Sequence, residues 1–240
     1  MNILFLIGLL IFSKHPTTGS NLSITKLSSK KIHTGGVIYF PVNLSETLTY
    51  KSDFGETKSW MTKEDSVIVF HNESDDFKYR QKLLINNTGV YVIETYQRFK
   101  VFLFIHKEGT YTYEKPLLRI PFPIVEGQQW NWKGTEFSDG DTSTVWVKGK
   151  VIGLDSVTTE AGKFEAMKVE SIIQTSDKTK NILTEWFAPG IGMVKMHLSI
   201  QGGGLMAFVR NLLGYSDINF ELTKISFNNL SSSGQAGTAQ

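Results

Sequence analysis

The chain has 240 residues, with 25 Lys and Arg against 23 Asp and Glu, and it contains no cysteine. This length allows one large β domain or two small ones, and the nearly balanced charge without a clustered basic face argues against nucleic-acid binding. The lack of cysteine excludes disulfides, thiolate metal sites, cysteine nucleophiles and the lipid-modified cysteine of bacterial lipoproteins.

Residues 1–20 are predicted to be a signal peptide, because residues 3–12 form an apolar run of the right length. The run is shorter than the about 18 apolar residues that a membrane-spanning helix needs. No charged side chain precedes it, so a buried first strand remains the alternative. Residues 21–36 are polar and are predicted to be a lead-in, and residues 228–240 are small and polar, which is typical of a disordered tail.

Between residues 37 and 227 the sequence predicts a single, mainly β domain. Segments rich in Val, Ile, Thr and aromatic residues alternate with short turn sequences, which favours an antiparallel meander. We expect a strongly curved antiparallel sheet or a partly open β-barrel with one short helical insert. The predicted strands are residues 37–42, 47–52, 57–62, 66–71, 76–85, 89–96, 99–106, 111–120, 127–134, 144–157, 163–174, 182–187, 193–200 and 217–227.

Glycine, proline and aspartate define the turns of this meander. Pro189-Gly190 ends one strand, since Pro has no N–H and Gly accepts a positive φ. Gly149 and Gly153 predict bulges or bends in the strand over residues 144–157. Asp139-Gly140-Asp141 predicts a hairpin turn, because the other ligand positions of a calcium loop are absent.

An internal duplication would relate residues 37–120 to residues 121–227. Phe40-Pro41 and Phe122-Pro123 are each followed by aromatic or apolar residues at the same offsets. The alternative is that two aromatic hairpins are alike by chance.

Residues 202–216 contain the helical insert, which is apolar on nearly every side. Such a helix must be buried or lie in lipid. It could be a lid over an apolar groove, but closure of the core is the commoner use of such a segment.

Two motifs carry a family resemblance. Residues 162–170 read Gly-Lys-Phe-Glu-Ala-Met-Lys-Val-Glu, and residues 185–195 read Glu-Trp-Phe-Ala-Pro-Gly-Ile-Gly-Met-Val-Lys. Together with Phe40-Pro41 and Pro121-Phe122-Pro123, they resemble uncharacterised exported bacterial proteins of the domain-of-unknown-function 3108 type. The resemblance implies a periplasmic or cell-envelope protein, soluble after signal cleavage, with a curved antiparallel β fold. It brings no catalytic residues.

Residue patterns for catalysis or metal binding are weak. The five histidines lack ligand spacing, and no Gly-x-Ser-x-Gly sequence supports a serine hydrolase. We therefore expect no catalytic residues, no metal and no cofactor, and a protein that is not an enzyme.

The hypothesis that follows is a non-enzymatic envelope protein that binds an apolar or amphipathic, lipid-like ligand on a concave β face. Its expected partners are a lipid or other apolar ligand and, peripherally, a membrane, but no nucleic acid. The alternatives are a structural or interaction protein with a packed interior and, least favoured, a hydrolase of envelope polymers. The candidate ligand-binding residues are Trp130, Trp132, Trp146, Trp186, Phe187 and Phe208.

Overall fold

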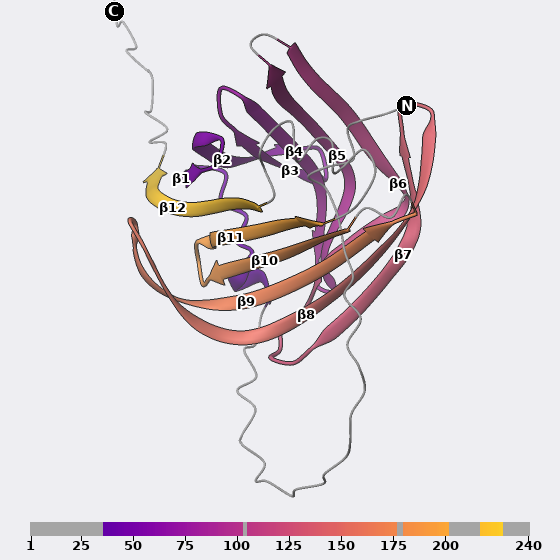
Figure 1. The fold of residues 1–240 in the computed structure, drawn as a ribbon. Coiled ribbons are helices and arrows are strands. Elements are labelled where there is room, and N and C mark those ends of the chain that lie inside the picture. The colour runs from indigo at the N-terminus through magenta and orange to yellow at the C-terminus, as the bar shows by residue number, and fades with distance from the viewer. Residues whose placement is uncertain (1–35, 103–104, 177–179, 202–216, 228–240) are drawn as a thin grey trace, which may run out of the picture.

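The computed structural model describes residues 36–102, 105–176, 180–201 and 217–227. These residues form a closed barrel of twelve antiparallel strands, preceded by a short 3-10 helix, η1 (Gly36–Tyr39) (Figure 1). The predicted mainly β, antiparallel fold is confirmed, and the barrel is closed rather than partly open. The strands are β1 (Glu46–Ser52), β2 (Gly55–Glu64), β3 (Val67–Glu73), β4 (Phe77–Asn86), β5 (Gly89–Phe102), β6 (Ile105–Pro121), β7 (Gln129–Ser138), β8 (Asp141–Thr159), β9 (Gly162–Thr175), β10 (Lys180–Ala188), β11 (Gly192–Gln201) and β12 (Asp217–Phe227).

Strand order follows chain order, so every pair of neighbouring strands is consecutive in the sequence, except β1 and β12. The ring closes where β12 pairs with β1, with Glu46 opposite Phe227. The long hairpin of β8 and β9 curves around the barrel in Figure 1, and its turn reaches β12, where the Ala161 N–H donates to the Leu222 carbonyl at 3.3 Å. Closure leaves no unpaired edge between the first and last strands.

Alternation along each strand separates the interior from the surface. On β7, Trp130, Trp132 and Glu136 are buried, whereas the intervening Asn131 and Lys133 are exposed. Side chains two residues apart share one face of a strand, so the two tryptophans point to the same side of β7.

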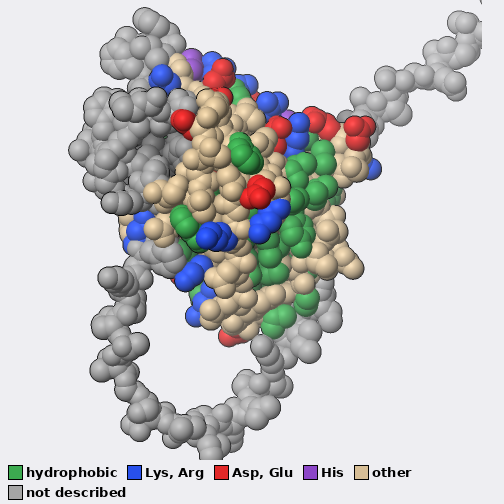
Figure 2. Space-filling view, turned by 90° about the vertical axis from the view of Figure 1, so that its right-hand side faces the viewer, with side chains coloured by type: hydrophobic (Ala, Val, Ile, Leu, Met, Phe, Trp, Pro, Cys, Tyr) green, Lys and Arg blue, Asp and Glu red, His purple; other side chains and the backbone are tan. Residues whose placement is uncertain are grey.

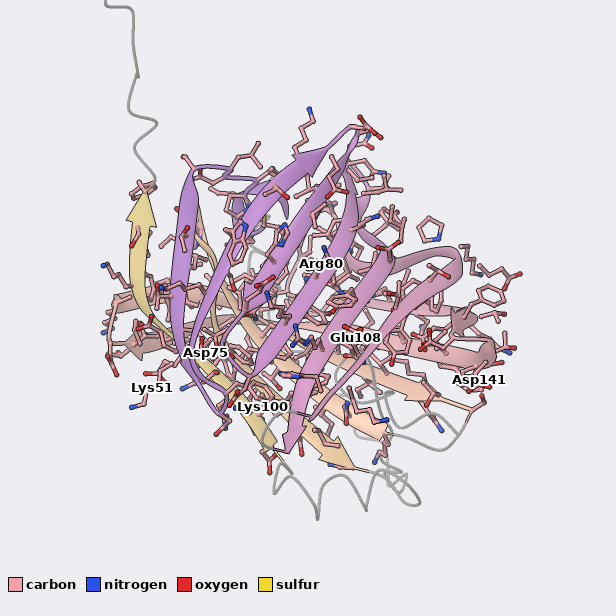
Figure 3. The ribbon with its side chains drawn as sticks, turned by 90° about the horizontal axis from the view of Figure 1, so that it is seen from above. Lys51, Asp75, Arg80, Lys100, Glu108 and Asp141 are labelled. Atoms are coloured by element: carbon pink, nitrogen blue, oxygen red, sulfur yellow. The ribbon has the colours of Figure 1, made fainter. Side chains whose placement is uncertain are left out.

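The outer surface mixes apolar and charged side chains. Figure 2 shows a band of hydrophobic side chains beside several Lys and Arg side chains. Among the charged residues labelled in Figure 3, Arg80 lies over the Tyr96 ring, 4.6 Å from its centre, and the Tyr96 hydroxyl donates to Glu108 at 2.6 Å. Within the described ranges, no helix combines the length and apolar character needed to cross a bilayer.

The strand predicted over residues 37–42 is wrong. This segment begins with η1 and then continues without regular structure to β1. Pro41 cannot donate a ladder hydrogen bond, and Tyr39 and Phe40 are buried instead, at 2% and 5% exposure. The Gly190 N–H donates to the Ile38 carbonyl at 2.7 Å, which ties the segment to the β10–β11 turn.

The strand predicted over residues 99–106 is also wrong, because it spans the connection between β5 and β6. Lys100 pairs with His106 across this hairpin. The stretch contains no Gly, Pro, Asn or Asp to mark a turn, so its apolar character resembled one continuous strand.

The predicted turns are largely confirmed. Asp139 and Gly140 have φ of 46° and 86° at the β7–β8 turn, and Gly190 has φ of 75° after Pro189. Gly153 lies at a register shift between β8 and β9, as expected for a bulge. Gly149 is different, since it pairs regularly with both neighbouring strands and instead leaves space for the Trp130 ring.

Several predictions lie outside the described residues. These are the signal peptide, most of the lead-in, the tail and the helical insert at residues 202–216. The internal duplication stays a prediction.

Candidate functional site

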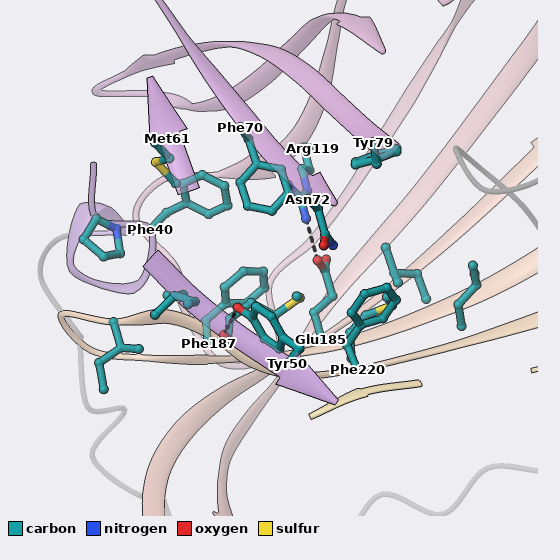
Figure 4. Close-up of a pocket in the computed structure, with 18 of the residues that line it drawn as sticks. Phe40, Tyr50, Met61, Phe70, Asn72, Tyr79, Arg119, Glu185, Phe187 and Phe220 are labelled. Atoms are coloured by element: carbon teal, nitrogen blue, oxygen red, sulfur yellow. Dashed lines mark hydrogen bonds and ion pairs between the residues drawn. The ribbon is translucent and has the colours of Figure 1, made fainter. Parts of the chain in front are cut away.

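The barrel encloses a mainly apolar cavity of about 110 Å³, measured as the space open to the centre of a water molecule. One water needs roughly 10–15 Å³ by this measure, so the cavity has room for roughly seven to eleven groups of that size. Figure 4 shows side chains from several strands pointing into it. Its apolar walls include Phe40, Leu48, Met61, Phe70, Phe77, Leu183, Phe187, Met193, Met196, Leu198 and Phe220.

Aromatic side chains border the cavity at both ends of β1. Before the strand, Phe40 packs against Phe187 with ring centres 5.9 Å apart. After it, Phe54 in the β1–β2 turn stacks on Phe77 at 4.7 Å and lies 6.3 Å from Phe220. Aromatic rings therefore lie on the cavity wall near both ends of β1.

An ion pair crosses the interior between opposite walls. Arg119 on β6 donates from Nη2 to Oε1 of Glu185 on β10 at 2.5 Å, and from Nη1 to Oε1 of Gln81 at 3.2 Å. The Arg119 side chain is 18% exposed and that of Glu185 only 3%. Because β7, β8 and β9 separate β6 from β10 in the ring, this pair braces two distant parts of the barrel.

Asn72 on β3 also lines the cavity, beside Arg119 and Glu185 in Figure 4. The residue is 5% exposed, and its side-chain Oδ1 is buried without a hydrogen-bond partner. A buried acceptor without a partner loses its hydration and gains nothing in return. Asn72, which lines the cavity, therefore carries a buried acceptor that a hydrogen-bond donor would stabilise.

Two tyrosines, the buried Tyr50 and the partly buried Tyr79, complete the polar part of the wall. The Tyr50 hydroxyl donates to the Met193 carbonyl at 2.7 Å. The pKa values of Tyr50 and Tyr79 both lie above the usual range of this side chain, mainly because the phenols are shielded from water. Both phenols are therefore neutral at physiological pH.

A second, smaller cavity of about 60 Å³ shares Arg119 and Glu185 with the first. Its lining is richer in polar groups and includes Gln81, Ser171 and Tyr113. The barrel interior thus becomes more polar beyond the ion pair, although apolar side chains still form much of the second lining, and this gradient suits a ligand with one apolar and one polar part.

Of the five predicted ligand-binding residues that the structure describes, Phe187 alone lies in the wall of the main cavity. Trp130 and Trp132 are buried in the barrel, but neither lines the cavity, since Trp130 packs on Gly149 and Trp132 Nε1 donates to the Pro116 carbonyl at 3.0 Å. Phe208 lies outside the described residues.

Trp146 and Trp186 do not line the main cavity either. Lys133 covers the Trp146 ring at 5.5 Å, and Trp186 Nε1 donates to Asp155 at 2.9 Å. Glu185 and Phe187 both line the cavity, so Trp186 between them must face the other side of β10.

The sequence analysis missed the roles of Arg119, Glu185 and Asn72. Their signal was a charged or amide residue at an inward position of an otherwise apolar strand, for example Arg119 between Leu118 and Ile120. That signal shows which face a residue occupies only once the register is known. Across the described part of the chain, no group of three or more His, Asp or Glu side chains is arranged to hold a metal ion.

Comparison with known proteins gives a family match and two structural likenesses. The DUF3108-like family model matches residues 129–208, which include β7 to β11, and this confirms the resemblance over that stretch. A candidate lipoprotein from Parabacteroides distasonis ATCC 8503 is 15% identical with a TM-score of 0.40, and the alignment covers 79% of this chain and 98% of that one. The hypothetical lipoprotein YmcC from Escherichia coli (K12) is 10% identical with a TM-score of 0.41, covering 79% and 89%. No curated protein matches the chain significantly.

Proposed function

We propose that this protein is a non-catalytic binding protein that holds a single-chain, lipid-like amphipathic molecule inside the barrel. The observation that carries the proposal is an apolar cavity that ends at a neutralised, buried ion pair. Arg119 and Glu185 engage each other, so neither is available as a general acid or base. A structural protein with a packed interior, the main alternative, has no need for such a space.

The size of the cavity sets the expected affinity. It suits a chain of about eight to ten carbons, and each buried methylene contributes about 0.8 kcal/mol. Ordering the ligand opposes this gain. The gross gain of about 6–8 kcal/mol is reduced by this cost, so we expect dissociation constants of tens of micromolar or weaker.

The proposed place of action is the periplasm or another part of a bacterial envelope. Support comes from the apolar run at residues 3–12 and from the family match at residues 129–208. A hydrophobic ligand carried outside the cytoplasm would need a protected cavity of this kind.

Filling the cavity tests the proposal. Met61 on β2 lines the cavity, so Met61→Trp should reduce the uptake of a fluorescent medium-chain lipid at least tenfold, measured by titration. Lys58 lies on the same strand with its side chain 59% exposed, and Lys58→Trp is the matched control. Equal binding by both variants would place the ligand elsewhere, and no binding by the unaltered protein would contradict the function.

A further inference from the structure

We propose that the cavity selects a ligand whose polar head is neutral and donates hydrogen bonds, such as an alcohol or primary amide, over an anionic carboxylate or a quaternary ammonium. This inference rests on the proposed function and specifies the class of ligand. It follows from the charge balance and the hydrogen bonding of three residues on three strands, Asn72, Arg119 and Glu185.

The charge balance disfavours ionic heads. Arg119 and Glu185 are one cation and one anion in direct contact, so together they present no net charge to the cavity. A carboxylate that captured Arg119 would leave Glu185 buried without its partner, and a cation that captured Glu185 would do the same to Arg119. Removing one member of a buried pair is costly, and an ionic head must also be desolvated.

Hydrogen bonding favours a donor. Asn72 Oδ1 is buried without a partner beside the ion pair. Oδ1 has almost no area open to the cavity, so a small rotation of the Asn72 side chain is needed before a ligand O–H or N–H can satisfy it. Such a contact leaves the hydrogen bonds of Arg119 to Glu185 and Gln81 undisturbed. A hydroxyl both donates and accepts, so it suits the Asn72 amide in either of its two orientations.

The position of these groups also orients the ligand. Asn72 and Arg119 lie together in Figure 4, with Phe70 and Met61 further along the same side of the cavity. A head held at Asn72 would thus leave its aliphatic chain against apolar walls, where it is sheltered from water.

A matched ligand series tests the inference by isothermal titration calorimetry at pH 8, below the micelle threshold of each compound. We expect decan-1-ol and decanamide to bind roughly tenfold or more tightly than decanoate and decyltrimethylammonium. Asn72→Leu, which keeps the approximate volume, should weaken decan-1-ol about five- to tenfold and leave decanoate unchanged. Asn131→Leu, at an exposed position of β7, is the control.

The outcomes separate the two proposals. Decanoate binding as tightly as decan-1-ol would overturn the head-group preference and leave the binding function intact. Failure of all four compounds to bind would instead remove the proposed function. If Asn72→Leu does not fold, as judged by circular dichroism, the ligand series on the unaltered protein decides alone.

Discussion

Among single side chains, Arg119 and Glu185 have the largest predicted effect on stability. Each is a charge removed from water, and each depends on the other for compensation. The pair therefore joins β6 to β10 at the expense of desolvation, and it fixes the polar boundary of the main cavity.

We predict that Arg119→Met lowers the free energy of unfolding by about 3–5 kcal/mol, because Glu185 is left buried and uncompensated. The double variant Arg119→Met/Glu185→Leu should recover much of this loss, since it removes both charges. Urea denaturation of the single and double variants gives the comparison. A double variant no more stable than the single one would show that the pair does not interact in this way.

His71 gives the barrel a predicted pH dependence. Its ring stacks on Trp60 with centres 4.8 Å apart, and its Nε2 lies 2.9 Å from Thr62 Oγ1. Burial lowers the pKa of His71, and nearby Arg80 acts in the same direction, against the opposing Glu73 and Glu64. The unfolded chain therefore binds this proton more readily than the folded one.

Stability contributed by neutral His71 is present above pH 6.5 and is lost as the pH falls through the folded-state pKa. When the pH is lowered from 7.5 to 5.5, the urea midpoint should thus fall further for the unaltered protein than for His71→Phe. This variant keeps an aromatic ring against Trp60. The same fall in both proteins would exclude His71 as the source.

At the level of strands, a close approach between β7 and β8 determines the packing of one tryptophan. A Cβ placed on Gly149 would lie 2.0 Å from the Trp130 ring, and the two residues are cross-strand partners. The ring thus occupies the space that any other side chain at position 149 would need.

We predict that Gly149→Ala destabilises the barrel by about 1–3 kcal/mol through overpacking. Combining it with Trp130→Leu should cost less than the sum of the two single changes, because the clash is then relieved. Thermal denaturation of the four proteins completes the cycle. Additive effects would mean that the ring and the new methyl group do not compete.

Strand boundaries were predictable where turn chemistry was visible. Asp139-Gly140 and Pro189-Gly190 mark turns through residues that accept or impose unusual backbone angles. The β5–β6 connection has no such residue, and segment 37–42 has the composition of a strand but packs against the β10–β11 turn. Both errors arose because an apolar composition indicates that a segment is buried, but not whether its backbone pairs with another strand.

For the whole molecule, the fold class followed from the number and spacing of apolar segments, whereas closure did not. Closure depends on the pairing of β1 with β12, in which Glu46 at the start of the first strand lies opposite Phe227 at the end of the last. The cavity was less predictable still, since it depends on which residues face inward on nonadjacent strands. Adjacent Trp186 and Phe187 were both proposed as lining, and the pleat of β10 allows only one.

The central claim is that one amphipathic chain lies inside the barrel with its head at Asn72. The most direct test is a crystal structure of the protein with 10-bromodecan-1-ol, in which anomalous scattering locates the bromine. We predict a bromine peak among the apolar side chains of the main cavity and the hydroxyl within hydrogen-bonding distance of Asn72. A bromine bound only outside the barrel, with the cavity left unoccupied by ligand, would contradict the account.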